Sequence, residues 1–431
     1  MLAVALPIVL VHVDFQPGFT VTAGSTHAHI VLSDLAVLAC LAAALVVAAR
    51  SGLGPLRDGV PAWIALAALL AFVIAACFYP LRGADPYPWH EHVVTAGKYV
   101  EYALLAPAVV LLVRRRDDLM HLVTTLVASS VVASTLSVAQ FFGWRIVKGW
   151  PAGYRQPSFL GHHDFAALSG ITLSVALAAI ALPAWRIDRR LTVAGGIAGT
   201  LGLFLSGSLA GAIGLLAAGA VAAIAARRGS LRRAGAILGI ALAVFGGVSL
   251  FRGGDVKSFL ELIGIGQKDN RVQVETYVQR TMLVYLGWRV FLDHPVAGAG
   301  WQASGDEYVY GPYLPVLHRK FPNTPPEGFP SPAHPYGIQN AYVQALADLG
   351  VVGLLLVLAA LLTPLALAAR RLVRGPPAAT TLLAAMWLLV TMGVLTALGL
   401  VAGIPTDALT WLAIGLCAAP AALAAEPSSE P

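Results

Sequence analysis

The chain has 431 residues, of which 58% are hydrophobic and 12% are charged, and its mean hydropathy is +0.76. This composition is too apolar for an ordinary soluble domain, so the bilayer must be the solvent for most of the chain. The formal net charge is +6, but the basic residues gather in short loops between apolar runs, which indicates membrane topology and not nucleic-acid binding. The three cysteines, Cys40, Cys77 and Cys417, have neither CxxC nor CxxH spacing, so we expect neither a disulfide framework nor a zinc site.

Apolar runs between polar residues predict about twelve spanning helices, since about 20 apolar residues cross the hydrocarbon core. They lie near residues 2–14, 29–49, 60–81, 92–113, 118–143, 164–183, 191–207, 209–226, 231–251, 340–369, 380–400 and 406–425. The first stretch has no basic n-region and no small-residue cleavage site, so we interpret it as a retained helix and not a signal peptide. The predicted fold is therefore an all-α polytopic membrane protein.

The basic residues predict which connections face the cytoplasm. They occupy alternate loops, as the positive-inside rule requires: Arg50 and Arg57; Arg114, Arg115 and Arg116; Arg186, Arg189 and Arg190; Arg227, Arg228, Arg232 and Arg233; and Arg370, Arg371 and Arg374. Both termini are then cytoplasmic. The predicted order along the chain is nine helices over 1–251, an extracytoplasmic loop over 252–339, three helices over 340–425 and a cytoplasmic tail over 426–431.

The extracytoplasmic loop is far longer than an ordinary helix connection, and loops of this length are usually functional. Its segment from Val272 to Leu292 has the apolar spacing of a helix, whereas the following part near 322–335 is rich in proline and predicts irregular backbone. The loop is therefore where we expect part of an outward-facing site.

Three outer segments carry polar residues that a lipid-facing surface does not need. The first is Tyr154–Asp164, with Arg155 and the run His162, His163, Asp164. The second carries Arg280 and Arg289 ahead of a glycine turn at 295–300. The third runs from His334 through Tyr336, Gln339 and Asn340 into a helix on which Asn340, Gln344 and Asp348 form a polar stripe at i, i+4 and i+8. Such a stripe usually faces a cavity or another helix.

These segments resemble the motifs of the O-antigen ligase and O-antigen polymerase family of bacterial membrane glycosyltransferases. Arg155 with Ser-Phe-Leu-Gly-His-His-Asp-Phe-Ala-Ala resembles the arginine and G-x-F-x-N-P-N-x-x-A segment of the family. Arg280 with Pro-Val-Ala-Gly-Ala-Gly resembles its second arginine and P-x-x-G-x-G turn, and Gln339-Asn340-Ala-Tyr-Val-Gln with Leu-Gly-Val-Val-Gly resembles its H-N-x-Y-L-Q…L-G-x-x-G helix start. The order of the motifs and the topology cover most of the chain.

The resemblance implies a GT-C-like membrane enzyme in the bacterial inner membrane, with its active site facing the periplasm or exterior. Such enzymes transfer a glycan from a polyprenyl diphosphate carrier to an acceptor hydroxyl, with no nucleotide sugar, no metal and no other cofactor. The acceptor stays open: a lipid makes the enzyme a ligase, a second carrier-linked glycan makes it a polymerase, and a protein side chain makes it an oligosaccharyltransferase. Membrane lipid is the other expected partner, and nucleic acid is not.

The chain departs from the family pattern at two positions. Gln339 stands where the family has a histidine, and Ser208-Leu209 stands where the family often has Ser-Arg. The first change removes the expected general base, and the second removes one expected diphosphate contact. A catalytically inactive family member is therefore one alternative function.

The chemistry of glycan transfer suggests roles for individual residues. Guanidinium groups bind phosphate oxygens in bidentate fashion, so we assign the leaving diphosphate to Arg155 and Arg280. The acceptor hydroxyl needs a proton acceptor, for which histidine is suited, and His334 is the nearest substitute for the missing histidine, followed by His162 and His163. The remaining predicted substrate-binding residues are Arg289, Asp164, Tyr336, Gln339 and Asn340.

Other interpretations of these residues compete with this one. Arg155 and Arg280 fit lipid headgroups as snorkelling arginines, and His334 fits an ordinary surface histidine. The run His162–Asp164 suggests a metal site, but adjacent residues rarely converge on one ion, and Asp164 is better explained as a helix cap.

Lys98 and Glu101 are spaced to form a structural ion pair. The rival function is a transporter or flippase for a polyprenyl-linked or other anionic substrate, against which the helices show no inverted repeat.

Overall fold

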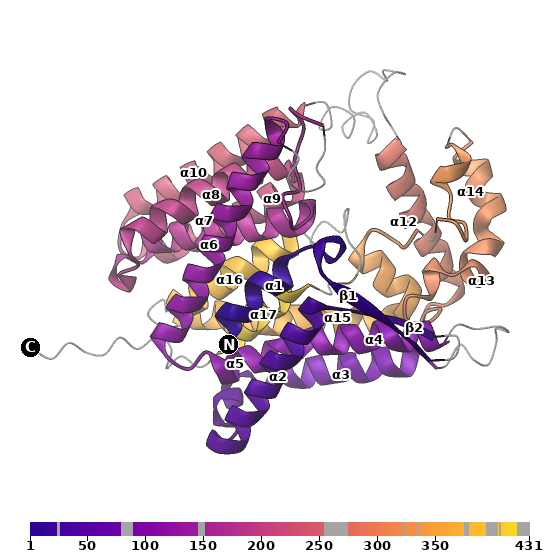
Figure 1. Cartoon of the computed structure of the whole chain (residues 1–431), viewed down its shortest axis with the longest axis horizontal. Helices are drawn as coiled ribbons and strands as arrows, with labels where there is room; N and C mark the ends of the chain where they lie inside the picture. The colour runs from indigo at the N-terminus through magenta and orange to yellow at the C-terminus, as the bar shows by residue number, and fades with distance from the viewer. Residues whose placement is uncertain are drawn as a thin grey trace, which may run out of the picture.

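The computed structural model describes residues 1–23, 26–78, 89–144, 151–253, 275–322, 324–334, 336–374, 379–393, 404 and 407–419. The described chain is mostly helical, as Figure 1 shows. Its α-helices are α1 (Leu2–Leu10), α2 (Leu32–Ser51), α3 (Val60–Ala76), α4 (Trp89–Ala103), α5 (Leu105–Leu112), α6 (Arg116–Phe141), α7 (His162–Ala181), α8 (Arg189–Ser206), α9 (Leu209–Arg227), α10 (Leu231–Phe251), α12 (Glu275–Asp293), α13 (Glu307–Tyr310), α14 (Leu314–Lys320), α15 (Ala341–Arg374), α16 (Ala379–Thr391) and α17 (Ala408–Ala418).

Every predicted spanning stretch contains a helix, which confirms the all-α polytopic class. Within the described residues, eight helical stretches are long and apolar enough to cross a membrane: 32–51, 54–76, 89–112, 116–141, 162–181, 209–227, 231–251 and 341–374. The predicted count of about twelve spans stays a prediction. Residues 394–400, 420–425 and the predicted tail 426–431 lie outside the described residues.

The helices form two groups with the loop region beside them (Figure 1). Helices α6 to α10 pack against one another, while α3 packs on α15 and α5 packs on both α2 and α17. Helix α16 contacts both groups, because it packs on α7 and α9 on one side and on α15 and α17 on the other. Helices α12, α13 and α14 lie at the end of the molecule away from the C-terminus, and α12 packs on α15.

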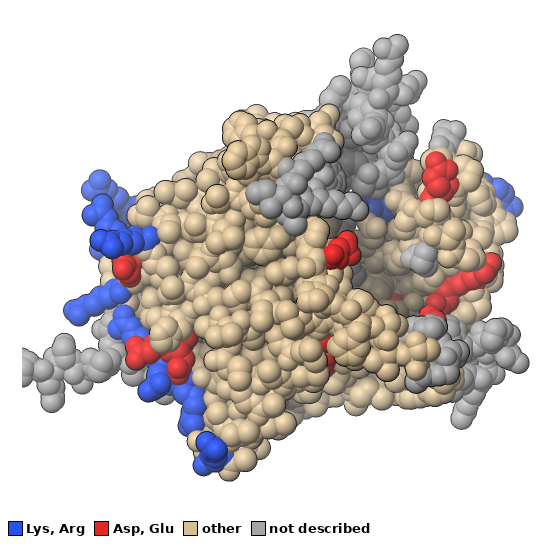
Figure 2. Space-filling view, viewed as in Figure 1, with Lys and Arg blue, Asp and Glu red and all other residues tan. Residues whose placement is uncertain are grey.

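The charged surface agrees with the predicted topology. On the face drawn in Figure 2, Lys and Arg gather at the end opposite α12, α13 and α14, and a broad uncharged surface separates that end from the loop region. The predicted arginine-rich loops join α5 to α6, α7 to α8, α9 to α10 and α15 to α16. Which end faces the cytoplasm stays a prediction from the positive-inside rule.

Residues 18–23 and 26–31 pair as the two strands of a β-hairpin, which corrects the predicted connection between the first two helices and the predicted helix start at residue 29. Strand β1 (Gly18–Ala23) pairs antiparallel with β2 (Thr26–Val31), with Ala23 opposite Thr26 and Gly18 opposite Val31. The sequence carries the signal, because β-branched and apolar residues alternate on both sides of Gly-Ser. Helix α2 therefore starts only at Leu32, where Asp34 accepts a hydrogen bond from the Val31 amide at 3.0 Å.

Helix α15 is broken at Gly350, where the backbone has φ +68 and is not helical. The gap is filled by the glycine turn 295–300, which follows α12. The amides of Ala299 and Gly300 donate to the carbonyls of Ala347 and Asp348 at 2.8 and 2.9 Å. In return, the amides of Val351 and Val352 donate to the carbonyls of Pro295 and Val296 at 2.9 and 3.2 Å. We call residues 295–300 and 347–352 the turn–kink junction.

The glycines of the turn–kink junction explain how two backbones come this close. A Cβ atom on Gly298 would lie 2.3 Å from the backbone carbon of Asp348, and one on Gly350 would lie 2.3 Å from the backbone of Val296. Both residues also have positive φ, which disfavours any other side chain. Gly298 of the turn and Gly350 of the kink thus allow the same close contact, through which the backbone of the broken helix α15 stays hydrogen-bonded.

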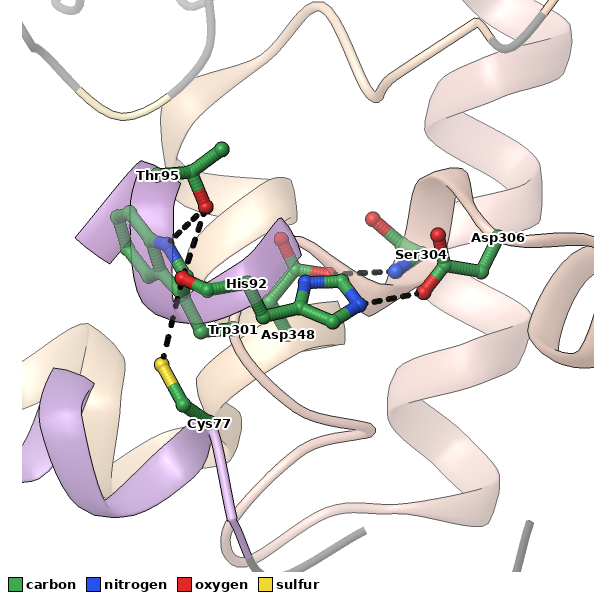
Figure 3. Close-up of polar contacts among 7 residues, drawn as sticks. All are labelled: Cys77, His92, Thr95, Trp301, Ser304, Asp306 and Asp348. Carbon is green, nitrogen blue, oxygen red and sulfur yellow. Dashed lines mark hydrogen bonds and ion pairs between the residues drawn. The ribbon is translucent and has the colours of Figure 1, made fainter. Parts of the chain in front are cut away.

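A polar network ties residues 301–306, which follow the glycine turn, to α4 and α15 (Figure 3). Nε2 of His92 lies 2.8 Å from Oδ2 of Asp306, and the indole of Trp301 donates to Oγ1 of Thr95 at 3.1 Å. Oδ1 of the fully buried Asp348 accepts a hydrogen bond from the Ser304 amide at 2.9 Å. The loop is therefore held at once by α4 and by α15.

Candidate functional site

A cavity of about 550 Å³ opens between α1, α2, α4, α7 and the start of α17. Its wall is apolar along 9–11 but carries charged and polar side chains elsewhere: His12, Asp34, Lys98, Tyr102, His163, Asp164, Gln302 and Asp407. Ligand cavities in proteins commonly have this mixture of apolar surface and a few polar groups. Two of the predicted site residues, His163 and Asp164, therefore line a space large enough for a substrate group.

The segment that carries Arg155 is fixed by hydrogen bonds to two helices and to the residues that follow α1. The Gln156 amide donates to the carbonyl of Leu205 in α8 at 2.8 Å. Gln140 of α6 accepts from the Ser158 amide at 3.0 Å and donates to the Ser158 carbonyl at 3.3 Å. Just after α1, the His12 amide donates to the carbonyl of Phe159 at 2.9 Å. These contacts explain how an irregular segment can hold Arg155 in one place.

Arg280 is oriented by the residue that replaces the family histidine. The side chain of Arg280 comes from α12, and its Nε donates to Oε1 of Gln339 at 3.1 Å. Gln339 is itself fixed because the next residue, Asn340, caps α15 by accepting from the amides of Tyr342 and Val343 at 3.1 and 3.0 Å. A glutamine at this position thus holds an arginine rather than removing a proton.

The two arginines predicted to bind diphosphate, Arg155 and Arg280, both act electrostatically on His163. The guanidinium groups of Arg155 and Arg280 both lie within electrostatic range of the His163 ring. Nδ1 of His163 is buried and has no hydrogen-bond partner within the part of the chain that the structure describes. Because His163 also lines the cavity, it connects the arginines to that space. We call Arg155 and Arg280 beside His163 the arginine site.

Arg289 lies away from this convergence. It is nine residues after Arg280 on α12, and at about 100° per residue the two side chains leave opposite faces of the helix. Arg289 acts electrostatically on Tyr313, whose hydroxyl donates to Oδ2 of Asp293 at 2.6 Å. Burial and the hydrogen bond to Asp293 raise the pKa of Tyr313. The substrate-binding role of Arg289 stays a prediction.

His334 and Tyr336 lie in the loop region and not on the cavity wall. His334 is exposed, and its ring stacks on Tyr336 with the ring centres 5.9 Å apart. The Tyr336 hydroxyl donates to the carbonyl of Glu327 at 3.1 Å. The roles predicted for these two residues stay predictions, and His163 is the histidine that lies beside both arginines.

Asp164 does not cap α7, contrary to the prediction. The cap position is Gly161, and Asp164 sits one turn in, where a carboxylate still favours the positive end of the helix. Asp164 instead faces the cavity, where it interacts electrostatically with Asp407 and Tyr102. Within the described chain, no cluster of three or more His, Cys, Asp or Glu residues is arranged to hold a metal ion.

Lys98 pairs with Asp34, which corrects the predicted pair with Glu101. Nζ of Lys98 lies 3.0 Å from Oδ2 of Asp34 and donates to the carbonyl of His29 at 2.7 Å. The prediction considered only neighbours on the same helix, whereas Lys98 reaches across to α2 and the hairpin. The pair places one cation and one carboxylate on the cavity wall.

Several cavity residues were not singled out by the sequence. Asp34, Tyr102 and Asp407 come from three separate helix regions, so their spacing in the chain gives no motif. Asp407 has a local signal, since it caps α17 by accepting from the amide of Thr410 at 2.8 Å, and Asp34 has the similar role already described at the start of α2. Gln344, on the predicted polar stripe, accepts from the amide of Ile404 at 2.9 Å and thereby fixes another residue of the cavity wall.

The fold and site define a multi-pass α-helical membrane protein with a polar cavity that reaches Gln302 of the loop region. A family model described as O-antigen ligase matches residues 194–358. The match confirms the resemblance to the O-antigen ligase and polymerase family, whose members are glycosyl-transfer enzymes. No curated protein matches the chain. The matched range includes Arg280 and both arms of the turn–kink junction, while Arg155 and His163 precede it.

Proposed function

We propose that this protein transfers a glycan from a polyprenyl diphosphate carrier to an acceptor hydroxyl at the outer side of the bacterial inner membrane. The observation that carries the proposal is the arginine site, where Arg155 and Arg280, from two distant segments, both act electrostatically on one histidine of the cavity wall. A leaving diphosphate gains negative charge, and fixed guanidinium groups stabilise such charge without being able to lose a proton. The family match supports transfer chemistry over transport.

We infer a specific course for the reaction from the family resemblance and from the residues of the arginine site. The acceptor oxygen attacks the anomeric carbon, and the bond from that carbon to the diphosphate oxygen breaks, so the carrier diphosphate leaves toward Arg155 and Arg280. The configuration at the anomeric carbon is inverted. The proton of the acceptor hydroxyl passes to a ring nitrogen of His163, which is half-buried on the cavity wall. Arg155 and Arg280 oppose a positive charge on this ring, and the negative charge of the leaving diphosphate offsets them.

The cavity provides room for the acceptor. Its apolar wall along 9–11 suits a lipid portion, and its carboxylates Asp34, Asp164 and Asp407 can accept hydrogen bonds from sugar hydroxyl groups. The proposal requires only that the acceptor carries a hydroxyl group, which can belong to a glycan, a lipid or a protein side chain. Gln339 and Asn340 act by positioning Arg280 and the start of α15.

The proposal is tested by turnover in nanodiscs with a polyprenyl diphosphate glycan as donor. Product should form with the wild type and fall by about 100-fold or more in Arg280→Ala, because one charge-assisted contact to the leaving group is lost. His163→Ala should lose a similar factor, whereas His334→Ala should keep most of the activity. Loss in His334→Ala with activity kept in His163→Ala would return the base to His334.

Transport is the outcome that would overturn the proposal. If no donor gives product, and the carrier-linked glycan crosses the bilayer of proteoliposomes in a manner that depends on Arg280, the protein is a flippase. If neither product nor transport is seen while the carrier still binds, the protein is an inactive family member.

A further inference from the structure

We propose that Arg252 is the third guanidinium of the arginine site and binds the carrier diphosphate together with Arg155 and Arg280. This inference rests on the proposed function, and it concerns a residue to which no motif pointed. Arg252 follows the last residue of α10, at the C-terminal end of that helix. It is half-buried and thus accessible to a ligand.

The turn between α8 and α9 brings Arg252 and Arg155 together. A Cβ atom on Gly207 would lie 3.2 Å from both Cδ and Nη1 of Arg252, and 3.4 Å from Cβ of Arg155. The two arginines therefore lie against the same glycine from different parts of the chain. Gly207 has φ +59 and directly precedes Ser208, which caps α9 by accepting from the Gly211 amide at 3.1 Å.

Electrostatics joins the same two arginines to the histidines. Arg155 and Arg252 both act on the ring of His162, while Arg155 and Arg280 act on the ring of His163. Arg155 thus acts on both of these adjacent histidines at the start of α7, while Arg252 acts on His162 and Arg280 acts on His163. Guanidinium groups bind phosphate oxygens in bidentate fashion, and a diphosphate has enough oxygens to accept hydrogen bonds from more than one of them.

This arrangement also bears on Leu209, which stands where the resembling family often has an arginine after the serine. The chain has no arginine after Ser208, yet the guanidinium of Arg252 lies beside the preceding residue, Gly207. A cation is therefore present at the turn, although it comes from the end of α10 and not from the turn itself. The arrangement predicts that an arginine at position 209 and the arginine at position 252 are interchangeable.

The test uses the full-length protein in nanodiscs and farnesyl diphosphate as the probe, with farnesyl monophosphate for comparison. Arg252→Ala should weaken farnesyl diphosphate binding about tenfold or more, since a charged contact is lost, and should weaken monophosphate binding less. Arg252→Lys should recover only part of the affinity, because an ammonium lacks the bidentate fork. Arg232→Ala, at the other end of α10, is the matched control and should bind as the wild type does.

The decisive variant combines Leu209→Arg with Arg252→Ala. Restored diphosphate affinity would support the proposal, because a merely structural role of Arg252 could not be replaced from another helix. A folded double variant that binds no better than Arg252→Ala would overturn it, as would wild-type affinity in Arg252→Ala alongside weakened binding in Arg280→Ala. Binding is measured apart from turnover, so a protein that binds diphosphate through Arg252 but transfers no glycan would refute only the proposed function.

Discussion

The turn–kink junction and the arginine site lie near opposite ends of α12, and they use opposite kinds of interaction. The junction is made from glycines and backbone hydrogen bonds and carries no charged side chain in its turn. The arginine site is made from charged side chains on separate segments, and Arg280 is oriented there by its hydrogen bond to Gln339. Glycine motifs here build the scaffold, whereas isolated polar residues supply the chemistry. Changes in the two regions should therefore have separable effects.

The largest effect on stability is expected from Gly350→Ala. The new Cβ would lie 2.3 Å from the Val296 backbone at a positive φ, so the junction must open. We expect the free energy of unfolding to fall by about 2 kcal/mol or more. Denaturant unfolding in detergent measures this, with Gly239→Ala on α10 as the control, because a Cβ there meets no atom within 4 Å. Equal stability of the two variants would contradict the proposed strain.

A smaller loss should follow Asp348→Ala. This change leaves the buried Ser304 amide without its 2.9 Å acceptor, which costs about 1–3 kcal/mol. Asp348→Asn keeps the Oδ1 acceptor and should cost clearly less in the same unfolding measurement. If both substitutions destabilise the protein equally, the carboxylate has a role other than accepting this hydrogen bond.

Gln339→Leu should affect activity and leave stability almost unchanged. The substitution removes the acceptor of the Arg280 Nε hydrogen bond, so the guanidinium is less well oriented, and we expect turnover to fall about tenfold. The control is Gln279→Leu, which removes a hydrogen bond from the neighbouring residue on α12 to the Gly328 carbonyl without touching Arg280. If the denaturation midpoint of Gln339→Leu falls so far that the variant is partly unfolded under the assay conditions, Gln339 stabilises the fold and does not orient Arg280.

The smallest effect concerns the ion pair on the cavity wall. A double-mutant cycle on Lys98 and Asp34 should give a coupling energy of about 0.2–1 kcal/mol, because the Lys98 side chain is 39% exposed and solvent screens the pair. A second cycle, on Lys98 and Glu101, should give a smaller coupling. A larger coupling energy for Lys98 with Glu101 than for Lys98 with Asp34 would support the ion pair predicted from the sequence.

The sequence predicted the features that depend on local pattern. Helix positions follow from apolar run length, and the helix from Val272 agrees with α12 over its described part, Glu275–Asp293. The predicted span near 92–113 agrees with the helical stretch 89–112, in which α4 and α5 meet at Leu104 and Pro107, in the first turn of α5, has no amide to donate. The same reasoning missed the hairpin, whose alternating residues were taken as part of a loop and of the following helix.

The site was predictable only in part, because its residues converge from distant segments. Arg155, Arg280 and His163 stand in recognisable motifs, so the sequence could name them. Nothing in the sequence indicated that Arg252 would lie beside Gly207, or that Lys98 would reach Asp34. Those contacts depend on how helices pack, which neither periodicity nor local spacing specifies.

The turn–kink junction also has a consequence for the order of biosynthesis. Residues 295–300 leave the ribosome before 347–352, so the turn is made before the helix that needs it. Until the two meet, α15 carries unpaired carbonyls at Ala347 and Asp348 and unpaired amides at Val351 and Val352, in a stretch otherwise apolar enough to enter the bilayer. Completion of α15 in the membrane is therefore coupled to the folding of the loop that precedes it.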